Sequence, residues 1–476
     1  MATTVINHFT FRSICIFIFF GFHLVAISGG ASSTVVISTE IYLKLTPRNN
    51  KPSSCIEISD MFAKSQTAQI TECRVMRGAL QTFRILATSR SNVTIQMLLE
   101  SKKEEGLIAW YEFRGDDLKP QTIALAVLSK TFLDYYRSLQ PKELEAQDVD
   151  FVDTSILRIR NLLTIYPPEK MVTVAVIDSG INFDNRILEG LYWKNTNELA
   201  GNGLDDDVNG YKDDDFGWDF VNERPIPARE KNDVLGHGTF IATIVAATAG
   251  LDASKWLRIM PLRVAGGSTG VGTVTPFALA EAIQYAVNNG AQVINISLGS
   301  TQSYDVVRES IDSALARGVK VVVSAGNTSS SLVLFPASLP GVFAVGALNT
   351  QGQIWSGSAQ GDGVDIYLRG TNMLIDLPVS FPGLASSGTS YAAPIATALS
   401  AMMLALAGDK PHQCLLTRNL IQNFRPTTQF AGEWLEVLTN QLESEIIQND
   451  LKNAWMQKQT VCGAQLTIAS ILRRSN

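Results

Sequence analysis

Charged residues, histidines and cysteines are all scarce in this chain. Of its 476 residues, 18% are charged and 46% are hydrophobic, whereas roughly 25% of an average soluble domain is charged. Lys and Arg number 39 and Asp and Glu 45, which gives a net charge of -6, and no stretch is a Lys/Arg tract. This balance excludes a polybasic nucleic-acid binder, and the apolar content argues against long disorder. The length is enough for two or three domains of roughly 100–200 residues each.

Long hydrophobic runs are limited to two places. After Arg12 an apolar run continues to about Ile27 and is followed by the small residues 28–31. This pattern is typical of a cleaved signal peptide over residues 1–31, with an uncleaved anchor as the alternative. The second run, Ala396–Ala407, stops at a Gly-Asp-Lys sequence, which indicates a buried core helix. We therefore expect entry into the secretory pathway, a final place outside the cell or in a secretory organelle, and no stable membrane span after signal cleavage.

The few cysteines agree with a secretory route. Cys15 belongs to the predicted signal peptide, and the other four form one pair near each end of the mature chain. We expect disulfides Cys55–Cys73 and Cys414–Cys462, since an even number of cysteines in a secreted chain favours pairing. Four free buried thiols are the alternative.

The early part of the chain reads as a small α+β unit over residues 32–115. An alternating stretch at 34–46 and an apolar one at 107–113 predict strands, and 93–103 has helical spacing. Residues 116–150 are mixed and end in an acidic stretch that is typical of a linker.

The pattern changes in the predicted domain at 151–410. Apolar runs that are too continuous for a half-exposed sheet alternate with helical stretches, the runs at 172–177, 256–262, 293–298, 319–324 and 342–347 and the helices at 277–289 and 306–316. This alternation predicts an α/β fold with a doubly wound parallel sheet and helices on both faces. Such sheets bind ligands beyond the carboxyl ends of their strands. Residues 411–476 are expected to form a helical extension.

Three polar residues stand at the expected ends of strands or starts of helices. Asp178 follows the first run, His237 lies between glycines before an apolar helix, and Ser390 begins another helix. A hydroxyl, an imidazole and a carboxylate are the parts of a nucleophilic acyl-transfer triad. Of the four histidines, two lie in the signal region and one beyond the sheet, so His237 is nearly the only candidate for a base.

The segments around these residues are Val-Ile-Asp-Ser-Gly, Gly-His-Gly-Thr and Gly-Thr-Ser-Tyr-Ala-Ala-Pro. Together they resemble the signature segments of subtilisin-like serine proteases, which share this Asp, His, Ser order. The resemblance implies a serine endopeptidase with a subtilisin-like fold. Two positions depart from the pattern, Phe240 and Ile395, where the family often has histidine. Neither belongs to the triad, so we expect changed packing and unchanged chemistry.

The resemblance extends to the groups around the triad. Asn327, in Ser-Ala-Gly-Asn, looks like the family's side-chain donor to the oxyanion. An extended peptide substrate is expected to add to strand-like segments in backbone fashion. The segments that resemble this substrate-binding surface are Gly270, Val271 and Gly272, Ser297, Leu298 and Gly299, and the pocket residues Ser324, Ala325 and Gly326.

An acidic insert separates Asp178 from His237. Asp205, Asp207 and Asn209 alternate and are followed by Tyr211 and Asp213, the start of an EF-hand-like spacing. The closing Glu of an EF-hand is missing, since Phe216 stands there. We expect these five residues to hold a structural calcium ion, as similar inserts do in related proteases. A solvated acidic loop is the alternative.

The resemblance also implies a zymogen. The unit at 32–115 has the place and size of a subtilase propeptide, an inhibitory folding domain, and self-cleavage is expected within the linker at 116–150. An unrelated binding domain is the alternative for this unit. For the whole chain the alternative is a catalytically inactive subtilase-like binding protein. A lipase-like hydrolase fits less well, since Ala392 stands where Gly-x-Ser-x-Gly needs its second glycine. The layout resembles secreted subtilases of protist parasites.

Overall fold

The computed structural model describes residues 23–25, most of 36–113, 119–120, and 154–407 apart from 166, 227–232, 234–235, 267–272 and 374–386. Most of the expected signal peptide and of the expected linker, and all of the expected helical extension at 411–476, therefore lie outside the described residues. The chain divides into two units, the first made of 1–74 and 83–116 and the second of 75–82 and 117–476.

The first unit is a five-stranded sheet with a helix, as expected of a small α+β domain. Its strands follow the order β1-β2-β4-β3, and β5 also pairs with β2. Their bounds are β1 His23–Val25, β2 Val36–Leu45, β3 Ala68–Val75, β4 Thr82–Ser89 and β5 Ile108–Phe113, and helix α1 spans Cys55–Ala63. A core of buried side chains from β2, β4, β5 and α1 fills the unit, among them Ile41, Leu43, Phe62 and Phe83. The strands expected at 34–46 and 107–113 are confirmed, whereas α1, β3 and β4 were not predicted.

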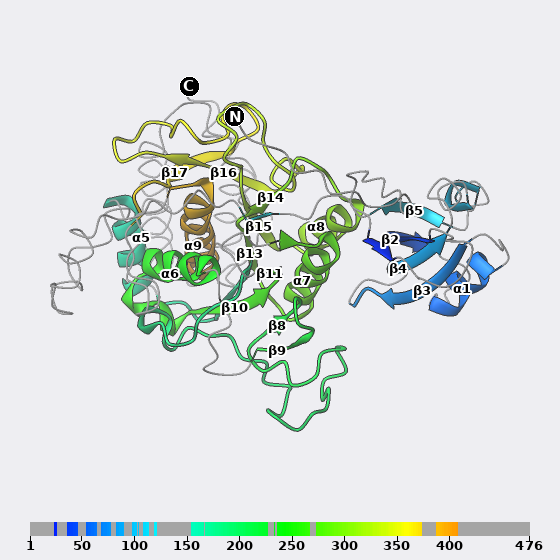
Figure 1. The fold of residues 1–476 in the computed structure, drawn as a ribbon. Helices are drawn as coiled ribbons and strands as arrows, with labels where there is room; N and C mark the ends of the chain where they lie inside the picture. Colours follow the sequence, from blue (N-terminus) through cyan, green and yellow to red (C-terminus); the bar gives the residue numbers. More distant parts are fainter. Residues whose placement is uncertain are drawn as a thin grey trace, which may run out of the picture. The chain divides into compact units, whose positions relative to one another are not determined.

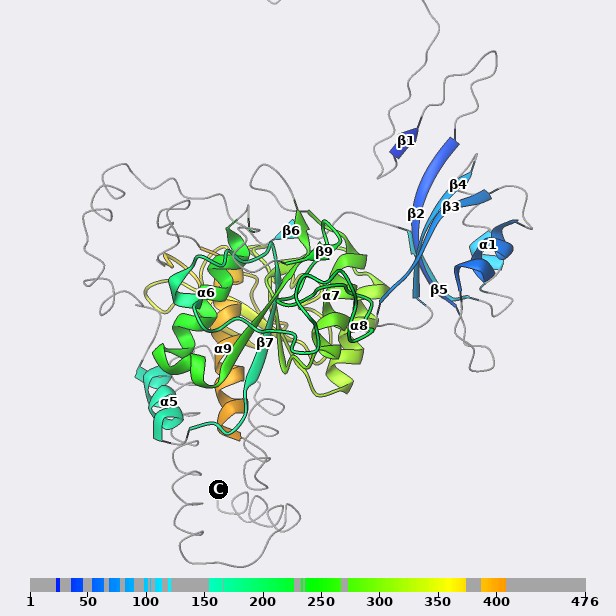
Figure 2. The ribbon, with the colours of Figure 1, turned by 90° about the horizontal axis from the view of Figure 1, so that it is seen from below.

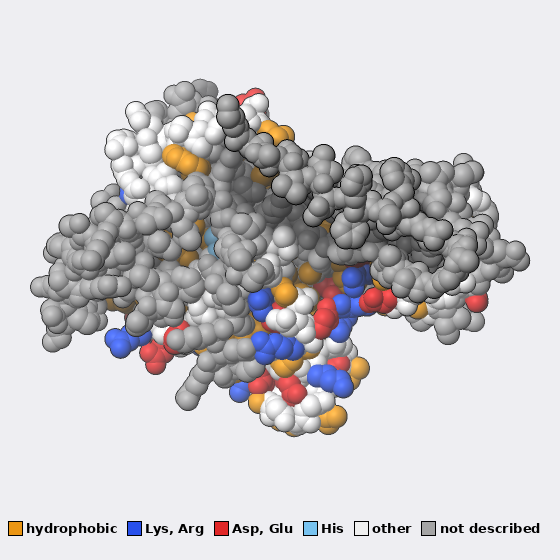
Figure 3. All heavy atoms as spheres, in the orientation of Figure 1, with side chains coloured by type: hydrophobic (Ala, Val, Ile, Leu, Met, Phe, Trp, Pro, Cys, Tyr) orange, Lys and Arg blue, Asp and Glu red, His pale blue; other side chains and the backbone are white. Residues whose placement is uncertain are grey.

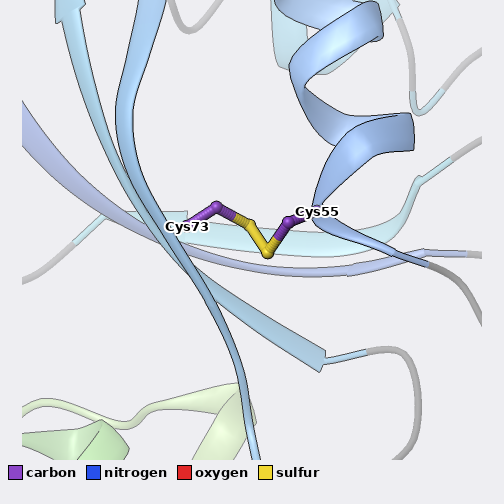
Figure 4. The surroundings of a disulfide bond; sticks show 2 residues. All are labelled: Cys55 and Cys73. Atoms are coloured by element: carbon purple, nitrogen blue, oxygen red, sulfur yellow. A yellow bond between two sulfur atoms is a disulfide. The ribbon is translucent and has the colours of Figure 1, made fainter.

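One of the two expected disulfides lies in this unit. Cys55 at the start of α1 is bonded to Cys73 in β3, with 5.8 Å between the two Cα atoms (Figure 4). The bond fixes the helix against the sheet. Cys414 and Cys462 lie outside the described residues, so their pairing stays a prediction.

The second unit is built on an eight-stranded sheet with the order β17-β16-β15-β13-β7-β10-β8-β9. All neighbours are parallel except β8 and β9. The strands are β7 Val172–Asp178, β8 Trp218–Asp219, β9 Arg224–Pro225, β10 Leu257–Arg263, β13 Val293–Ile296, β15 Lys320–Ser324, β16 Phe343–Leu348 and β17 Ile366–Arg369. All seven residues of β7 are buried, as the continuous apolar run predicted.

Helices cover both faces of this sheet (Figures 1 and 2). Helices α5, α6 and α9 lie together on one face, and α7 and α8 on the other. Their bounds are α5 Thr154–Ile165, α6 His237–Ala249, α7 Pro276–Asn288, α8 Asp305–Ala316 and α9 Thr389–Ala407. The doubly wound parallel sheet is therefore confirmed. The short elements are the 3₁₀ turns η1 Arg186–Leu188 and η2 Leu251–Lys255 and the strand pairs β11 Ala265–Gly266 with β12 Thr273–Val274 and β6 Lys119–Pro120 with β14 Leu298–Gly299.

Helix α9 is long and apolar enough to cross a membrane, but 94% of its apolar window is buried inside the protein. Small residues such as Ala398 and Ala401 let it pack closely against α6 and the sheet. The prediction of a buried core helix at 396–407 is thus confirmed.

Candidate active site

The order of the strands predicts where a ligand binds to this sheet. From β7 the chain passes to β8 and β9 at one edge of the sheet, comes back to β10 beside β7, and then continues on the other side of β7 with β13 and β15. The strand order therefore reverses between β7 and β13. In parallel sheets, ligands bind beyond the carboxyl ends of the two strands at such a topological switch point. Asp178 ends β7, Ser297 follows β13 and Asn327 follows β15 by a few residues. Three polar residues from three adjacent strands therefore meet at one edge.

Asp178 and His237 form a buried pair at this edge. Asp178 Oδ1 lies 2.7 Å from His237 Nδ1, and the side chains are 1% and 4% exposed. Burial lowers the pKa of His237, but the charge and hydrogen bond of Asp178, with the charge of Asp233, outweigh burial and raise it above the ordinary value. His237 Nε2 is buried and has no hydrogen-bond partner among the described residues. The second ring nitrogen is thus left open to accept a proton.

The close approach of these two residues depends on Gly238. A Cβ at that position would lie 2.2 Å from the carbonyl oxygen of Gly180 and 3.0 Å from Cβ of Asp178. Only glycine lets the first turn of α6 lie this near the end of β7. The glycine after the histidine in the Gly-His-Gly motif therefore has a direct steric cause.

Ser390 is fully buried at the start of α9. Its hydroxyl donates to the carbonyl of Ser297 at 3.4 Å. The ring of the next residue, Tyr391, lies 5.8 Å from the His237 ring, which brings the start of α9 beside the histidine. Proline at 394 has no N–H for the Ser390 carbonyl four residues earlier, and the hydroxyl of Ser297 donates to that carbonyl instead, at 3.0 Å. Ser297 therefore holds the first turn of α9 against the end of β13.

A buried polar chain strengthens this connection. Thr397 in α9 donates to the side-chain oxygen of Asn295 at 2.8 Å, and the amide nitrogen of Asn295 donates to Ser297 Oγ at 3.1 Å. All three side chains are fully buried. Satisfied buried polar groups fix one arrangement of their elements, because every alternative leaves a group without a partner.

Asn327 lies next to Ser390's helix and is oriented by it. Its side-chain oxygen accepts from the N–H of Thr389 at 3.0 Å and from the Thr389 hydroxyl at 3.1 Å. These two donors identify the oxygen of the amide, so the nitrogen is the end that can donate to a bound group. The preceding residue, Gly326, has a φ of 114° and its N–H donates to the Thr389 hydroxyl.

The expected substrate-binding segments are only partly described. Ser297, Leu298 and Gly299 lie at the crevice, and Ser324, Ala325 and Gly326 lead from β15 to Asn327. Gly270, Val271 and Gly272 lie outside the described residues. In the second unit, β14 carries an antiparallel partner, β6, in which Pro120 faces Leu298 and Lys119 faces Gly299. The segment expected to bind an extended peptide is thus paired with a strand of the chain itself.

The acidic insert brings together part of the predicted calcium ligands. Carboxylate oxygens of Asp205, Asp207 and Glu198 all lie within 4.8 Å of one another. This oxygen-only donor set fits calcium. The sequence did not point to Glu198, because it lies outside the alternating spacing. In Figure 1 the insert is the loop that extends below β8 and β9. The space-filling view of Figure 3, in the same orientation, shows Asp and Glu side chains at this place.

The other predicted ligands have different neighbours. The backbone N–H of Asn209 donates to Asp205 and Asp207 at 3.0 and 3.1 Å, and Asp213 accepts from the N–H of Gly203 at 2.9 Å. The ring of Tyr211 packs edge-on against Trp218 and Tyr285.

The two departures from the family pattern are accommodated by packing. Phe240 lies edge-on against Tyr391, with ring centroids 5.0 Å apart, and Ile395 is buried in the core. Two residues that sequence reasoning missed also contact the site. Ser179 and Asp233 link the residues around Asp178 and His237 by hydrogen bonds.

Comparisons with known proteins agree with this geometry. The family model described as "Subtilase family" matches residues 169–436, more than half of the chain. A thermophilic serine proteinase of Bacillus sp. (strain AK1) is 32% identical over 48% of this chain and 51% of its own length. Subtilisin Savinase of Lederbergia lenta is 33% identical over 35% of this chain and 62% of its own length.

The chain thus spans about half the length of the curated relatives it matches. A solved structure of the prenylagaramide maturation protease PagA aligns with 52% of this chain and 80% of its own, at 23% identity and a TM-score of 0.39. With the family model covering the sheet, the crevice and all three signature segments, the chain belongs to the subtilase family.

Proposed function

We propose that this chain is a serine endopeptidase that hydrolyses peptide bonds in extended polypeptides. The observation that carries the proposal is the buried pair of Asp178 and His237, 2.7 Å apart, at the switch point of the sheet. A serine hydroxyl is a weak nucleophile, and it attacks a peptide carbonyl only when an adjacent base such as this imidazole takes its proton. Ser390, at the head of the adjacent helix α9, is the nucleophile in this proposal.

In the proposed reaction, His237 Nε2 takes the proton of the Ser390 hydroxyl as Oγ bonds to the scissile carbonyl carbon. The Asp178 carboxylate keeps the Nδ1–H tautomer and stabilises the imidazolium. Asn327 donates to the oxygen on which negative charge develops. The imidazolium then protonates the leaving amine as the C–N bond breaks, and water hydrolyses the acyl-enzyme by the same steps.

A fluorophosphonate probe tests this function, because it reacts with a serine only where a base activates it. We expect the wild-type chain to be labelled on Ser390 and Ser390→Ala not to be labelled. His237→Ala keeps the serine and should also lose labelling. If the three proteins were labelled equally, or if the folded wild type were not labelled at all, a catalytically inactive binding protein would be favoured.

The proposal includes synthesis as a self-processing zymogen with the first unit as propeptide and inhibitor. The pairing of β6 with β14 supports this, since Lys119 and Pro120 follow the first unit and lie on the segment expected to bind substrates. Gln121 is the next residue after Pro120 in the sequence, and Ser297, the residue before Leu298, has a carbonyl that accepts from the Ser390 hydroxyl at 3.4 Å. Gln121 itself lies outside the described residues. We propose that self-cleavage breaks the bond between Gln121 and Thr122.

Calcium and a secretory route complete the proposal. Glu198, Asp205 and Asp207 would hold the ion, and its charge would offset their mutual repulsion. The apolar run after Arg12 and the disulfide between Cys55 and Cys73 support passage through an oxidising compartment.

A further inference from the structure

A buried carboxylate that takes no part in the proposed reaction lies beside the catalytic pair. Asp233 precedes α6 by four residues, and it is 2% exposed. Its Oδ1 accepts from the Ser179 hydroxyl at 2.7 Å and from the N–H of Gly236 at 2.8 Å. Its Oδ2 accepts from the N–H and the hydroxyl of Thr239, at 2.7 and 2.5 Å. Burial raises the pKa of Asp233 above its ordinary value, and the hydrogen bonds from Thr239 and Ser179 oppose that shift by stabilising the charged form.

These bonds cap the helix that carries His237. The N-cap residue of α6 is Gly236, which has no side chain with which to accept a hydrogen bond. Asp233 accepts the N–H groups of the first turn in its place, where the helix dipole also favours a negative charge. The position and tilt of His237, the first helical residue, therefore depend on this carboxylate.

The same carboxylate is connected to Asp178 through Ser179. The Ser179 hydroxyl donates to Asp233 and accepts from the N–H of Gly238 at 2.9 Å. Ser179 directly follows Asp178, and Gly238 directly follows His237. The hydrogen bonds among Ser179, Asp233 and Gly238 therefore hold the residue after Asp178 against the residue after His237. They fix the end of β7 against the start of α6.

We propose that Asp233 is a positioning residue for catalysis, which sets the contact between Asp178 and His237 through Ser179 and the first turn of α6. The inference rests on the proposed hydrolase function. The carboxylate also acts on the imidazolium by charge. The titratable groups that face His237 among the described residues are Asp178 from β7, Asp233 from the segment before α6 and Tyr391 from α9.

Asp233→Asn tests the proposal with little change of volume. Each carboxylate oxygen of Asp233 accepts two hydrogen bonds. The NH₂ group of the new amide replaces one of these oxygens and cannot accept, so the bonds from either Thr239 or Ser179 and Gly236 must break. We expect kcat to fall about 10- to 100-fold per active site, which corresponds to the loss of one or two charge-assisted hydrogen bonds. KM should change little. The acid limb of kcat/KM should move to lower pH, because a negative charge that favours the imidazolium has been removed.

A matched control is available in the same unit. Asp219 is also a buried carboxylate, and it accepts from Val221, Asn222 and Arg263. Asp219→Asn should lower Tm without moving the acid limb or the kcat of the folded fraction, counted by active-site titration. A purely structural role for Asp233 would give the same result as this control, and that result would overturn the inference.

Ser179→Ala provides a second variant if Asp233→Asn fails to fold. It removes the hydroxyl that accepts from the N–H of Gly238 and leaves the hydrogen bonds from Gly236 and Thr239 to Asp233 in place, so we expect a Tm only slightly below the wild type and a kcat about tenfold lower. A kcat within about twofold of wild type would overturn the inference. If the wild-type chain itself hydrolyses nothing, the proposed function fails and the inference with it. An active wild type with unaffected variants refutes the inference alone.

Discussion

At the scale of single residues, the charge around His237 determines the pH at which the proposed enzyme works. The pKa of His237 is raised above its ordinary value because the charges of Asp178 and Asp233 outweigh the effect of burial. A general base must be unprotonated, so activity is lost as pH falls through this raised pKa. We expect the acid limb of kcat/KM, measured from about pH 5 to pH 10 with a peptide substrate, to lie above the ordinary histidine pKa.

Asp178→Asn checks the cause of this shift. The amide removes the charge and favours the wrong tautomer of the imidazole, which costs on the order of 10⁴ in kcat in a comparable triad. The residual activity should have its acid limb at lower pH than the wild type. An acid limb that does not move would contradict the assignment of Asp178 as the partner of His237.

Gly238→Ala is expected to abolish activity in a protein that still folds. The added Cβ would overlap the carbonyl of Gly180, so the start of α6 must move away from β7. Misplacement of catalytic groups by about 1 Å costs about 100-fold in rate. The measurement is kcat per folded molecule. Gly352→Ala is a suitable control, because nothing lies within 4 Å of its Cβ. Its φ of 76° is strained for alanine, so this variant should lower Tm and leave kcat unchanged.

Asn327→Ala should lower kcat while KM stays nearly constant. The donor acts on charge that develops after binding, and subtilisin itself loses about 10²–10³ in kcat when its asparagine donor is removed. Steady-state kinetics with a peptide substrate measure both constants. A rise in KM with kcat unchanged would instead assign Asn327 to substrate binding.

At the scale of elements, the acidic insert is the part of the second unit whose stability should depend on a metal ion. Saturation to 100 times the Kd would stabilise the folded protein by about 2.7 kcal/mol. We expect calcium to raise Tm by several degrees and EDTA to reverse the rise. The variant Asp205→Asn with Asp207→Asn should lose this response, and Glu198→Gln should weaken it.

Asp252→Asn is the control for the insert, since Asp252 is an exposed carboxylate paired with Lys255 at 2.7 Å. It changes the charge of the protein without touching the cluster, and its response to calcium should equal that of the wild type. A double variant that calcium still stabilises fully would show that the insert does not bind the ion.

The elements also show which features a sequence reveals. The strand β7 could be predicted because seven consecutive buried residues leave an unmistakable apolar run. The two-residue strands β8 and β9 carry no such signal. Glu198 and Asp233 were missed for a related reason: a single carboxylate in a loop has no periodicity, and its role depends on contacts with residues far away in sequence, such as Ser179. The triad candidates were found because glycines and small residues surround each of them in a recognisable pattern.

At the scale of the whole molecule, the zymogen proposal predicts the fate of the full chain. The purified wild type should separate into two fragments, and the larger one should begin at Thr122, which N-terminal sequencing would show. Ser390→Ala should remain intact in the absence of other proteases. Equal processing of the two proteins would refute self-cleavage, and a first residue well away from 122 would refute the proposed cleavage site.

A mixing experiment separates the two modes of cleavage. Since Lys119 and Pro120 pair with β14 of their own chain, we expect cleavage within one molecule, at a rate independent of concentration. Ser390→Ala incubated with a trace of wild type should then be cut slowly at the same bond.

Ser390, at the head of α9, is the last along the chain of the four residues proposed for catalysis, while Asp178 and His237 belong to elements made much earlier. During synthesis from the amino end, a ribosome-bound chain therefore carries its acid and its base for a long stretch without any nucleophile. Helix α9 also packs against β13, β15 and β16, so it can dock only after nearly the entire sheet exists. In the proposed mechanism, an unfinished polypeptide would therefore lack its nucleophile and could not cleave neighbouring proteins during its own synthesis.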